Sequence, residues 1–269
     1  MDILKRNLAP ITEEAWEEIN ETASQILKAN LSARRFVDVE GPKGWDFSGV
    51  PLGRVNVAQG KAKEGVNYGV RTIQPLVDAR VLFDLDVWEL DNAVRGAEDI
   101  DLEPLEDAAR KIALFEERAI YQGFKDADIK GLKESSEHKP IKFSGDPQNV
   151  LGAVSDGIAE FASAGVEGPY RLVAGRQLWK EVARQECGYP LTRRLERLVD
   201  SEIILNPTLE ETMLISVRGG DMKLTLGVDF SIGYNSADAE KVRLYFTESF
   251  TFQVLDGLAV IPINWTKKK

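Results

Sequence analysis

The residue types that most often do chemistry in proteins are scarce in this chain. His138 is the only histidine and Cys187 the only cysteine among 269 residues. A single histidine excludes an H-E-x-x-H zinc site and a di-iron centre built from two Glu-x-x-His pairs. A nucleophile pair would need Cys187 beside His138, yet one lies in a Gly-Tyr-Pro turn and the other in a charged run. We expect an incidental thiol and a surface histidine.

Phosphate and carboxylate chemistry also lack the spacing that they need. The stretch from Gly53 to Lys61 loosely resembles a Walker loop, but its spacing is wrong and Ala62 replaces the required hydroxyl. Adjacent carboxylates at 13–14, 116–117 and 210–211 could serve as acid and base. On helices and turns such pairs more often form solvated faces, which is our prediction here. We therefore predict that the chain is not an enzyme.

Trp88 is the one aromatic residue that suggests a ligand. In the alternating run 79–88 it shares a predicted strand face with Arg80, Asp84 and Asp86, so a planar cofactor such as a flavin could stack on it. Packing at a subunit contact is the alternative that we favour. No feature of the sequence requires a cofactor, and none indicates a metal site.

Composition and charge narrow the class of protein and its partners. Hydrophobic residues make up 43% and charged residues 29%, as in soluble globular proteins. No run approaches the roughly 20 apolar residues of a membrane-spanning helix. A single cysteine and a start without a signal-peptide pattern indicate the cytoplasm. The net charge of −10, from 44 acidic and 34 basic residues, disfavours bulk nucleic-acid binding.

The order of elements along the chain predicts an α+β fold. Apolar spacing indicates one helix over 12–35 and another over about 104–125, with a strand over 79–88 between them. Shorter helices and strands follow, and the last third is nearly all β. Because helices and strands do not alternate regularly, neither a doubly wound sheet nor a barrel of parallel strands is expected.

Residues 50–71 contain two short β-like runs with little apolar content. A hairpin of this kind cannot bury itself and is marginal in water. An extended arm becomes stable when it lies against another surface, often that of a neighbouring subunit. The sequence therefore predicts self-association.

Several long segments form a recognisable order along the chain: LKRNLAPITEEAWEEI, RRFVDVEGPKGW, DLDVWELDNAVRG, VEGPYRLV, RGGDMKLTLGVDFSIGY and FTESFTFQV. Together they resemble the encapsulins, the shell proteins of bacterial and archaeal nanocompartments. The resemblance implies the major capsid fold of tailed bacteriophages (Hong Kong 97 type). It divides the chain into an N-terminal helix with the start of the peripheral domain (1–47), an extended arm loop (48–75), the peripheral domain with its spine helix (76–133), an axial domain (134–225) and C-terminal peripheral strands (226–269).

The same resemblance implies an icosahedral shell around a cargo enzyme. The smallest closed arrangement (T=1) would have on the order of 60 subunits. The cargo would be a ferritin-like protein or a dye-decolorising peroxidase, held through its C-terminal targeting tail, for iron storage or oxidative-stress defence. Iron would be a cofactor or substrate of this cargo and not of the shell subunit.

Two groups of site residues follow from the resemblance. The docking groove would comprise Leu27, Leu31, Arg34, Asp38 and Ile232, and the spacing of the first three places them on one face of the predicted helix. A pore would form at the turn Glu186, Cys187, Gly188 and Tyr189, where the carboxylate of Glu186 would attract cations.

Two rival functions remain open at this point. A phage-type major capsid protein would package DNA, against which the net charge of −10 and the helix in place of a long scaffold segment both count. A peptidase or bacteriocin-like activity is the second, and the single histidine and missing nucleophile motif count against it.

Overall fold

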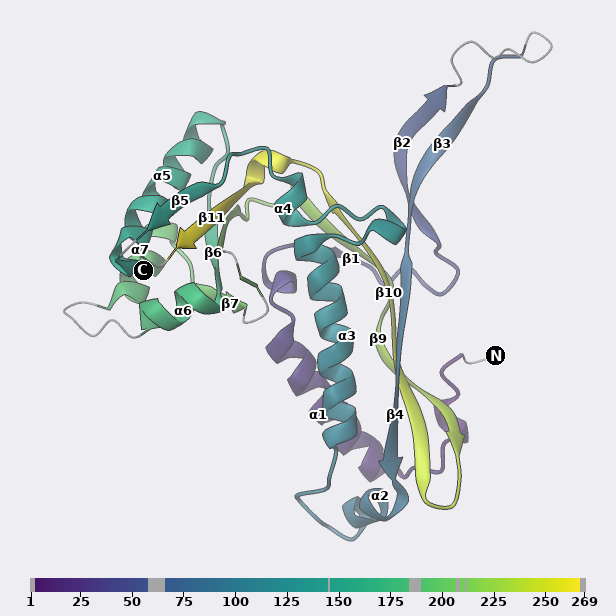
Figure 1. Cartoon of the computed structure of the whole chain (residues 1–269). Helices are drawn as coiled ribbons and strands as arrows, with labels where there is room; N and C mark the ends of the chain where they lie inside the picture. Colours follow the sequence, from purple (N-terminus) through teal and green to yellow (C-terminus); the bar gives the residue numbers. More distant parts are fainter. Residues whose placement is uncertain are drawn as a thin grey trace.

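The fold is that of a computed structural model, which describes residues 3–57, 66–144, 146–183, 190–206, 209–210 and 212–266 (Figure 1). Its helices are α1 (Glu13–Asn30), α2 (Val87–Val94), α3 (Glu103–Gln122), α4 (Leu132–Ser135), α5 (Val150–Ser163), α6 (Arg176–Ala183) and α7 (Leu191–Val199). Its strands are β1 (Asp38–Glu40), β2 (Gly49–Val57), β3 (Gly69–Pro75), β4 (Val77–Asp86), β5 (Ile141–Ser144), β6 (Tyr170–Gly175), β7 (Ile204–Asn206), β8 (Thr212–Ser216), β9 (Met222–Ala237), β10 (Lys241–Val254) and β11 (Val260–Thr266). The mixture of helix and sheet agrees with the predicted α+β class.

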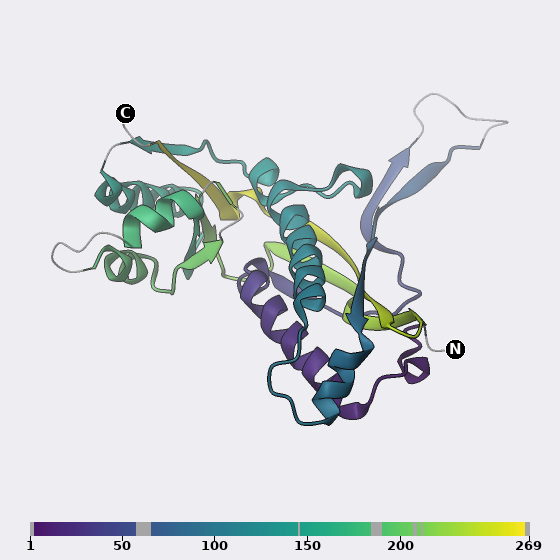
Figure 2. The same ribbon diagram turned by 60° about the horizontal axis from the view of Figure 1, so that its bottom comes forward.

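Two long helices and a four-stranded sheet form the first unit. The strand order is β1-β9-β10-β4, with β1 parallel to β9 and the other pairs antiparallel. Helices α1 and α3 lie side by side along this sheet in both views (Figures 1 and 2). The hydroxyl of Thr12 accepts from the N–H of Ala15 and caps α1, as its position in the sequence predicts. Apolar stripes on both helices close a core against β4, β9 and β10.

A five-stranded sheet forms the second unit, in the order β5-β11-β8-β6-β7. Helices α5, α6 and α7 pack with it around a separate apolar core that includes Phe161, Leu172, Leu195 and Leu214. A third cluster joins the two units, because it contains residues of α3, of β9 and β10, and of β6 and β8.

The C-terminal strand corrects one predicted boundary. Residues 226–269 were expected to form peripheral strands together, but β11 pairs with β5 and β8 in the second sheet. Conversely, β9 begins at Met222, inside the range predicted for the axial domain. The chain therefore crosses back into the second unit after β10, and this unit is assembled from two separated stretches of sequence.

The arm is a long two-stranded hairpin. Strands β2 and β3 pair only with each other and project away from both units (Figure 1). Its apolar side chains are largely exposed, among them Val55, Val57, Val70 and Ile73. At its base, the amide of Gln74 donates to the backbone carbonyl of Phe252 at 2.8 Å and anchors the arm to β10. Over the described ranges, no helix is long and apolar enough to cross a membrane.

Candidate docking groove

The first helix ends earlier than its apolar pattern predicts. α1 stops at Asn30, Leu31 takes a non-helical conformation (φ −90°, ψ 81°), and Arg34 lies in a separate 3₁₀ turn, Ala33–Arg35. Leu27, Leu31 and Arg34 therefore do not share the face of one continuous helix. The chain instead turns at Leu31 and carries Arg34 toward the sheet.

These residues nevertheless meet at one hollow of about 360 Å³ between α1 and β9. Its walls come from the N-terminal segment, α1, the 3₁₀ turn, β9 and β10: Leu4, Arg6, Asn20, Ala23, Ser24, Leu27, Lys28, Leu31, Arg34, Asp229, Phe230, Ser231, Ile232 and Phe246. Four of the five predicted groove residues, Leu27, Leu31, Arg34 and Ile232, are among them.

Asp38 is the predicted groove residue that lies elsewhere. It is exposed at the start of β1, and its Oδ2 accepts from the backbone N–H of Gly220 at 2.6 Å. That contact holds the turn before β9, whose glycines Gly219 and Gly220 both have positive φ. Asp38 does not line the hollow, because the chain between Arg34 and Asp38 leaves it to enter the sheet. A contact of Asp38 with cargo stays a prediction.

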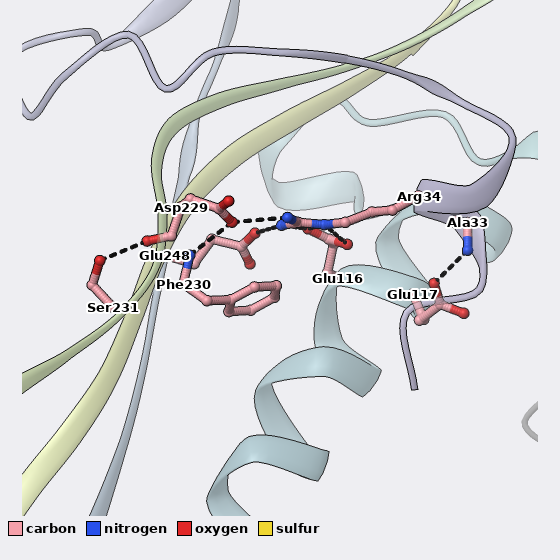
Figure 3. Close-up of polar contacts among 8 residues, drawn as sticks. All are labelled: Ala33, Arg34, Glu116, Glu117, Asp229, Phe230, Ser231 and Glu248. Atoms are coloured by element: carbon pink, nitrogen blue, oxygen red, sulfur yellow. Dashed lines mark hydrogen bonds and ion pairs between the residues drawn. The ribbon is translucent and has the colours of Figure 1, made fainter. Parts of the chain in front are cut away.

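Arg34 forms ion pairs with three carboxylates at the end of the groove (Figure 3). Its guanidinium donates to Glu116 at 2.5 Å and to Glu248 at 2.7 Å, both through Nη2, and to Asp229 at 2.8 Å through Nη1. Glu116 and Glu248 are fully buried, whereas about half of the Asp229 side chain is exposed. The ring of Phe230 lies 4.6 Å below the guanidinium carbon. Arg34 therefore joins four segments of the chain and is not a free donor.

One arginine faces three carboxylates in this cluster. Burial alone would lower the pKa of Arg34, but the hydrogen bond with Glu116 and the charges of Glu116, Glu248 and Asp229 raise it above its usual value. Burial raises the pKa of Glu248 well above its usual range, the neighbouring Glu116 raises it further, and Arg34 only partly offsets this. The Oε2 atom of Glu248 is buried without a hydrogen-bond partner in the described structure.

Glu117, the next residue of α3, forms a second buried cluster. Its carboxylate accepts from the hydroxyl of Ser32 at 2.5 Å, from the N–H of Ala33 at 2.9 Å and from the amide of Asn206 at 2.8 Å. The hydroxyls of Ser32 and Tyr121 also lie 2.8 Å apart. Because Asn206 belongs to β7, this cluster links the end of α1 and helix α3 to the second sheet.

Sequence reasoning missed both buried carboxylates. The pair 116–117 was expected on a solvated face, yet Glu116 and Glu117 are almost completely buried. A signal was present, because Glu116 falls on the apolar stripe of α3 with Ile112, Ala113 and Ala119. A charged residue on such a stripe implies a buried partner of opposite charge.

We expect the second cluster to make stability depend on pH. Burial raises the pKa of Glu117 from 4.5 to about 7, against the hydrogen bonds from Ser32 and Ala33. The folded subunit therefore retains a proton that the unfolded chain releases. Its stabilising effect is complete below pH 4.5 and is lost as the pH rises through about 7, by up to about 3 kcal/mol.

Thermal unfolding of wild-type and Glu117→Gln shells between pH 5 and 8 checks this. The difference in stability between the two should change in favour of the variant as the pH rises, because glutamine does not ionise. A difference that stays constant over this range would contradict the raised pKa.

The proposed stacking pair is not formed within one subunit. β4 ends at Asp86, whose carboxylate accepts from the N–H of Trp88 at 2.8 Å and begins α2, so Trp88 is on a helix and not on a strand. The Trp88 side chain is 70% exposed, and the guanidinium carbon of Arg95 lies 5.5 Å from its ring. Arg80 stacks instead on Tyr245, at 4.2 Å. Within one subunit Arg80 therefore packs on Tyr245 and Arg95 on Trp88. Stacking of a flavin on Trp88 stays a prediction.

The remaining predicted sites add no chemistry in the described ranges. Glu186, Cys187, Gly188 and Tyr189, the predicted pore, lie outside the described residues. The ring Nε2 of His138 is 2.9 Å from the carbonyl oxygen of Leu258, a contact between two loops. The described part of the chain contains no group of three or more His, Cys, Asp or Glu residues arranged to hold a metal ion.

Comparisons with known proteins agree with the fold and identify the family. A family model described as an encapsulating protein for peroxidase matches residues 1–251. The chain is 39% identical over 265 residues to the type 1 encapsulin shell protein of Mycolicibacterium paratuberculosis, a match that covers 98% of this chain and 100% of that protein.

Solved structures extend the likeness at the level of fold. The virus-like particle of Pyrococcus furiosus has a TM-score of 0.62 at 14% identity, over 92% of this chain and 98% of that chain. The capsid of Myoviridae phage XM1 has a TM-score of 0.51 at 13% identity, over 88% and 92%. The relatives by sequence are named as shell proteins, which are structural and not catalytic. The chain therefore belongs to the encapsulin family, as a subunit with the Hong Kong 97 type capsid fold that forms the shell of a protein compartment.

Proposed function

We propose that the shell encloses a cargo protein, whose C-terminal targeting tail docks in the hollow between α1 and β9. The observation that carries this proposal is the convergence of Leu27, Leu31, Arg34 and Ile232 on one hollow. An open groove of this size, with apolar walls and polar groups at its rim, suits a short peptide better than a globular surface.

Two classes of enzyme are candidates for the cargo. The matching family model is named for a peroxidase, which supports a dye-decolorising peroxidase as cargo. A ferritin-like protein is the second candidate, and it would give the compartment a role in iron storage besides oxidative-stress defence. The shell would have T=1 symmetry with 60 subunits, lie in the cytoplasm and contain no nucleic acid, as the net charge of −10 favours. A cation pore at 186–189 stays a prediction.

Blocking the hollow should empty the shell without preventing its assembly. Ser24 lines the hollow and is partly exposed, so Ser24→Trp fills the space without removing any core side chain. Leu31 is a poorer target, because it is only 8% exposed and a charge there would also disturb folding. We expect Ser24→Trp particles of normal size with at least tenfold less cargo.

The matched control is Gln25→Trp, which adds the same side chain at the next, exposed position outside the hollow. The cargo is first identified by mass spectrometry of native particles. Each shell variant is then coexpressed with this cargo, either complete or without its last 20 residues, and the mass of the purified particles gives the loading. Full loading of Ser24→Trp shells, or of shells with the tail-deleted cargo, would end the docking proposal.

A further inference from the structure

The outer edge of β9 has a free stretch beside the hollow, between two segments that already pair with it. Before this stretch, the loop that follows β1 donates two backbone N–H groups to the carbonyls of Leu226 and Gly227, at 2.9 and 2.8 Å. After it, the N–H of Tyr234 donates to the carbonyl of Leu4 at 2.7 Å. No strand or backbone segment of the described chain pairs with this edge over residues 228–233.

Ile232 directs its backbone groups toward this edge. The N–H of Tyr234 points away from β10, since it binds Leu4. β9 and β10 stay in register from Tyr234 to Ile232 without a bulge. Backbone groups alternate in direction along a strand, so the N–H and C=O of Ile232 point outward as well. Ile232 lines the hollow although only 5% of its surface is exposed, which fits a contribution through its backbone.

The opposite wall and the rim restrict what can pair there. Leu27 of α1 and Leu31, just after its end, line the hollow and contribute apolar surface to it. Lys28 lies on the rim and has no ion pair with any side chain of the described ranges. The one carboxylate of the lining, Asp229, is already bound by Arg34. Lys28 is therefore a cation on the rim that is open to a carboxylate of the docked peptide.

We infer that the docked peptide is an extended strand that adds to β9 at Ile232 and ends in a carboxylate near Lys28. This inference rests on the proposed function and specifies how the tail binds. The strand edge provides main-chain hydrogen bonds, and alternate side chains of the peptide turn toward α1. The tail should therefore carry apolar residues at positions i and i+2. The edge without a paired strand spans six residues, about 20 Å. Within it the N–H groups of Val228 and Phe230 are already bound by Ser249 and Asp229, so main-chain pairing centres on Ile232.

A scan of backbone N-methylation tests the geometry directly. The probe is a synthetic peptide that copies the last 20 residues of the protein recovered from native particles. Each amide nitrogen near its C-terminus is methylated in turn, and binding to empty shells is measured by fluorescence anisotropy. Methylation removes a donor and blocks strand pairing, so alternate positions should lose at least tenfold in affinity while those between them change little. Amidation of the terminal carboxylate should weaken binding, and Lys28→Ala should remove that difference.

A pair of shell variants tests the same contact from the other side. Ile232→Pro removes an N–H that β10 does not use, which an edge position tolerates. Ile232→Val is the matched control, because it keeps the N–H and most of the side chain. We expect a tenfold or greater loss for the proline variant alone, in shells of normal size.

The outcomes separate this inference from the proposed function. A peptide that fails to bind wild-type shells would overturn tail docking itself. A peptide that binds, but whose N-methyl scan shows no two-residue alternation, would overturn strand addition and leave tail docking intact. Should the proline variant prevent assembly, the scan on wild-type shells decides alone.

Discussion

Replacing Arg34 by alanine should destabilise the subunit strongly, and not merely empty the groove. The substitution leaves Glu116 and Glu248 without their shared cation, and both side chains are fully buried. Removing one partner from a buried ion cluster typically costs about 3–5 kcal/mol. In a chain of this length that corresponds to a fall in Tm of about 10 °C, measurable by calorimetry. We expect few particles of normal size.

Two further variants distinguish the loss of the buried ion cluster from the loss of a single positive charge. Arg35→Ala is the matched control, because the adjacent arginine is exposed and its pair with Glu202 is at the surface. It should cost less than about 1 kcal/mol. Arg34→Met combined with Glu116→Gln and Glu248→Gln removes all three buried charges and should recover much of the stability. Stable, normal-sized Arg34→Ala shells that lack only cargo would show instead that Arg34 acts in docking alone.

Helices and strands of the first unit could be predicted because their patterns are local. Thr12 as N-cap, Pro104 in the first turn of α3 and the alternation in β4 each depend on neighbours within a few residues. Trp88 shows the limit of this reasoning. The alternation of β4 continues into α2, but Asp86 and Glu89 form an N-cap signature that marks the change from strand to helix.

The groove was partly predictable, and the resemblance carried most of that prediction. Helical spacing supported the grouping of Leu27, Leu31 and Arg34, yet the helix ends at Asn30 and they converge through a turn. Asp38 was assigned by the resemblance alone, and it does not line the hollow.

Partners that are far apart in the sequence were beyond the reach of local patterns. The contacts of Arg34 with Glu116, Asp229 and Glu248 span 82, 195 and 214 residues. Nothing near Arg34 in the sequence indicates which carboxylates it meets. The return of β11 to the second sheet is unpredictable for the same reason, because strand pairing depends on the whole fold.

Charges on the arm should prevent assembly while leaving the subunit folded. Val57 and Val70 are 64% and 63% exposed, and they lie on opposite faces of the hairpin because Val70 pairs with Asn56, the neighbour of Val57. Apolar side chains exposed on both faces indicate that neighbouring subunits cover both. Burial of a valine is worth about 1.5–3 kcal/mol, and a closed shell repeats each contact in every subunit. Val57→Asp with Val70→Asp should therefore yield dispersed subunits instead of megadalton particles.

Mass photometry gives the particle mass, and thermal unfolding of the dispersed subunits reports whether they remain folded. Among the described residues of the arm from 49 to 73, none belongs to the three apolar cores, so an unfolding transition should persist in the variant. Val57→Ile with Val70→Ile keeps both faces apolar and serves as the control that assembles. Normal shells from the aspartate variant would show that the exposed valines face solvent in the particle. The subunit interface would then have to lie on the two globular units, and the long hairpin would need another explanation.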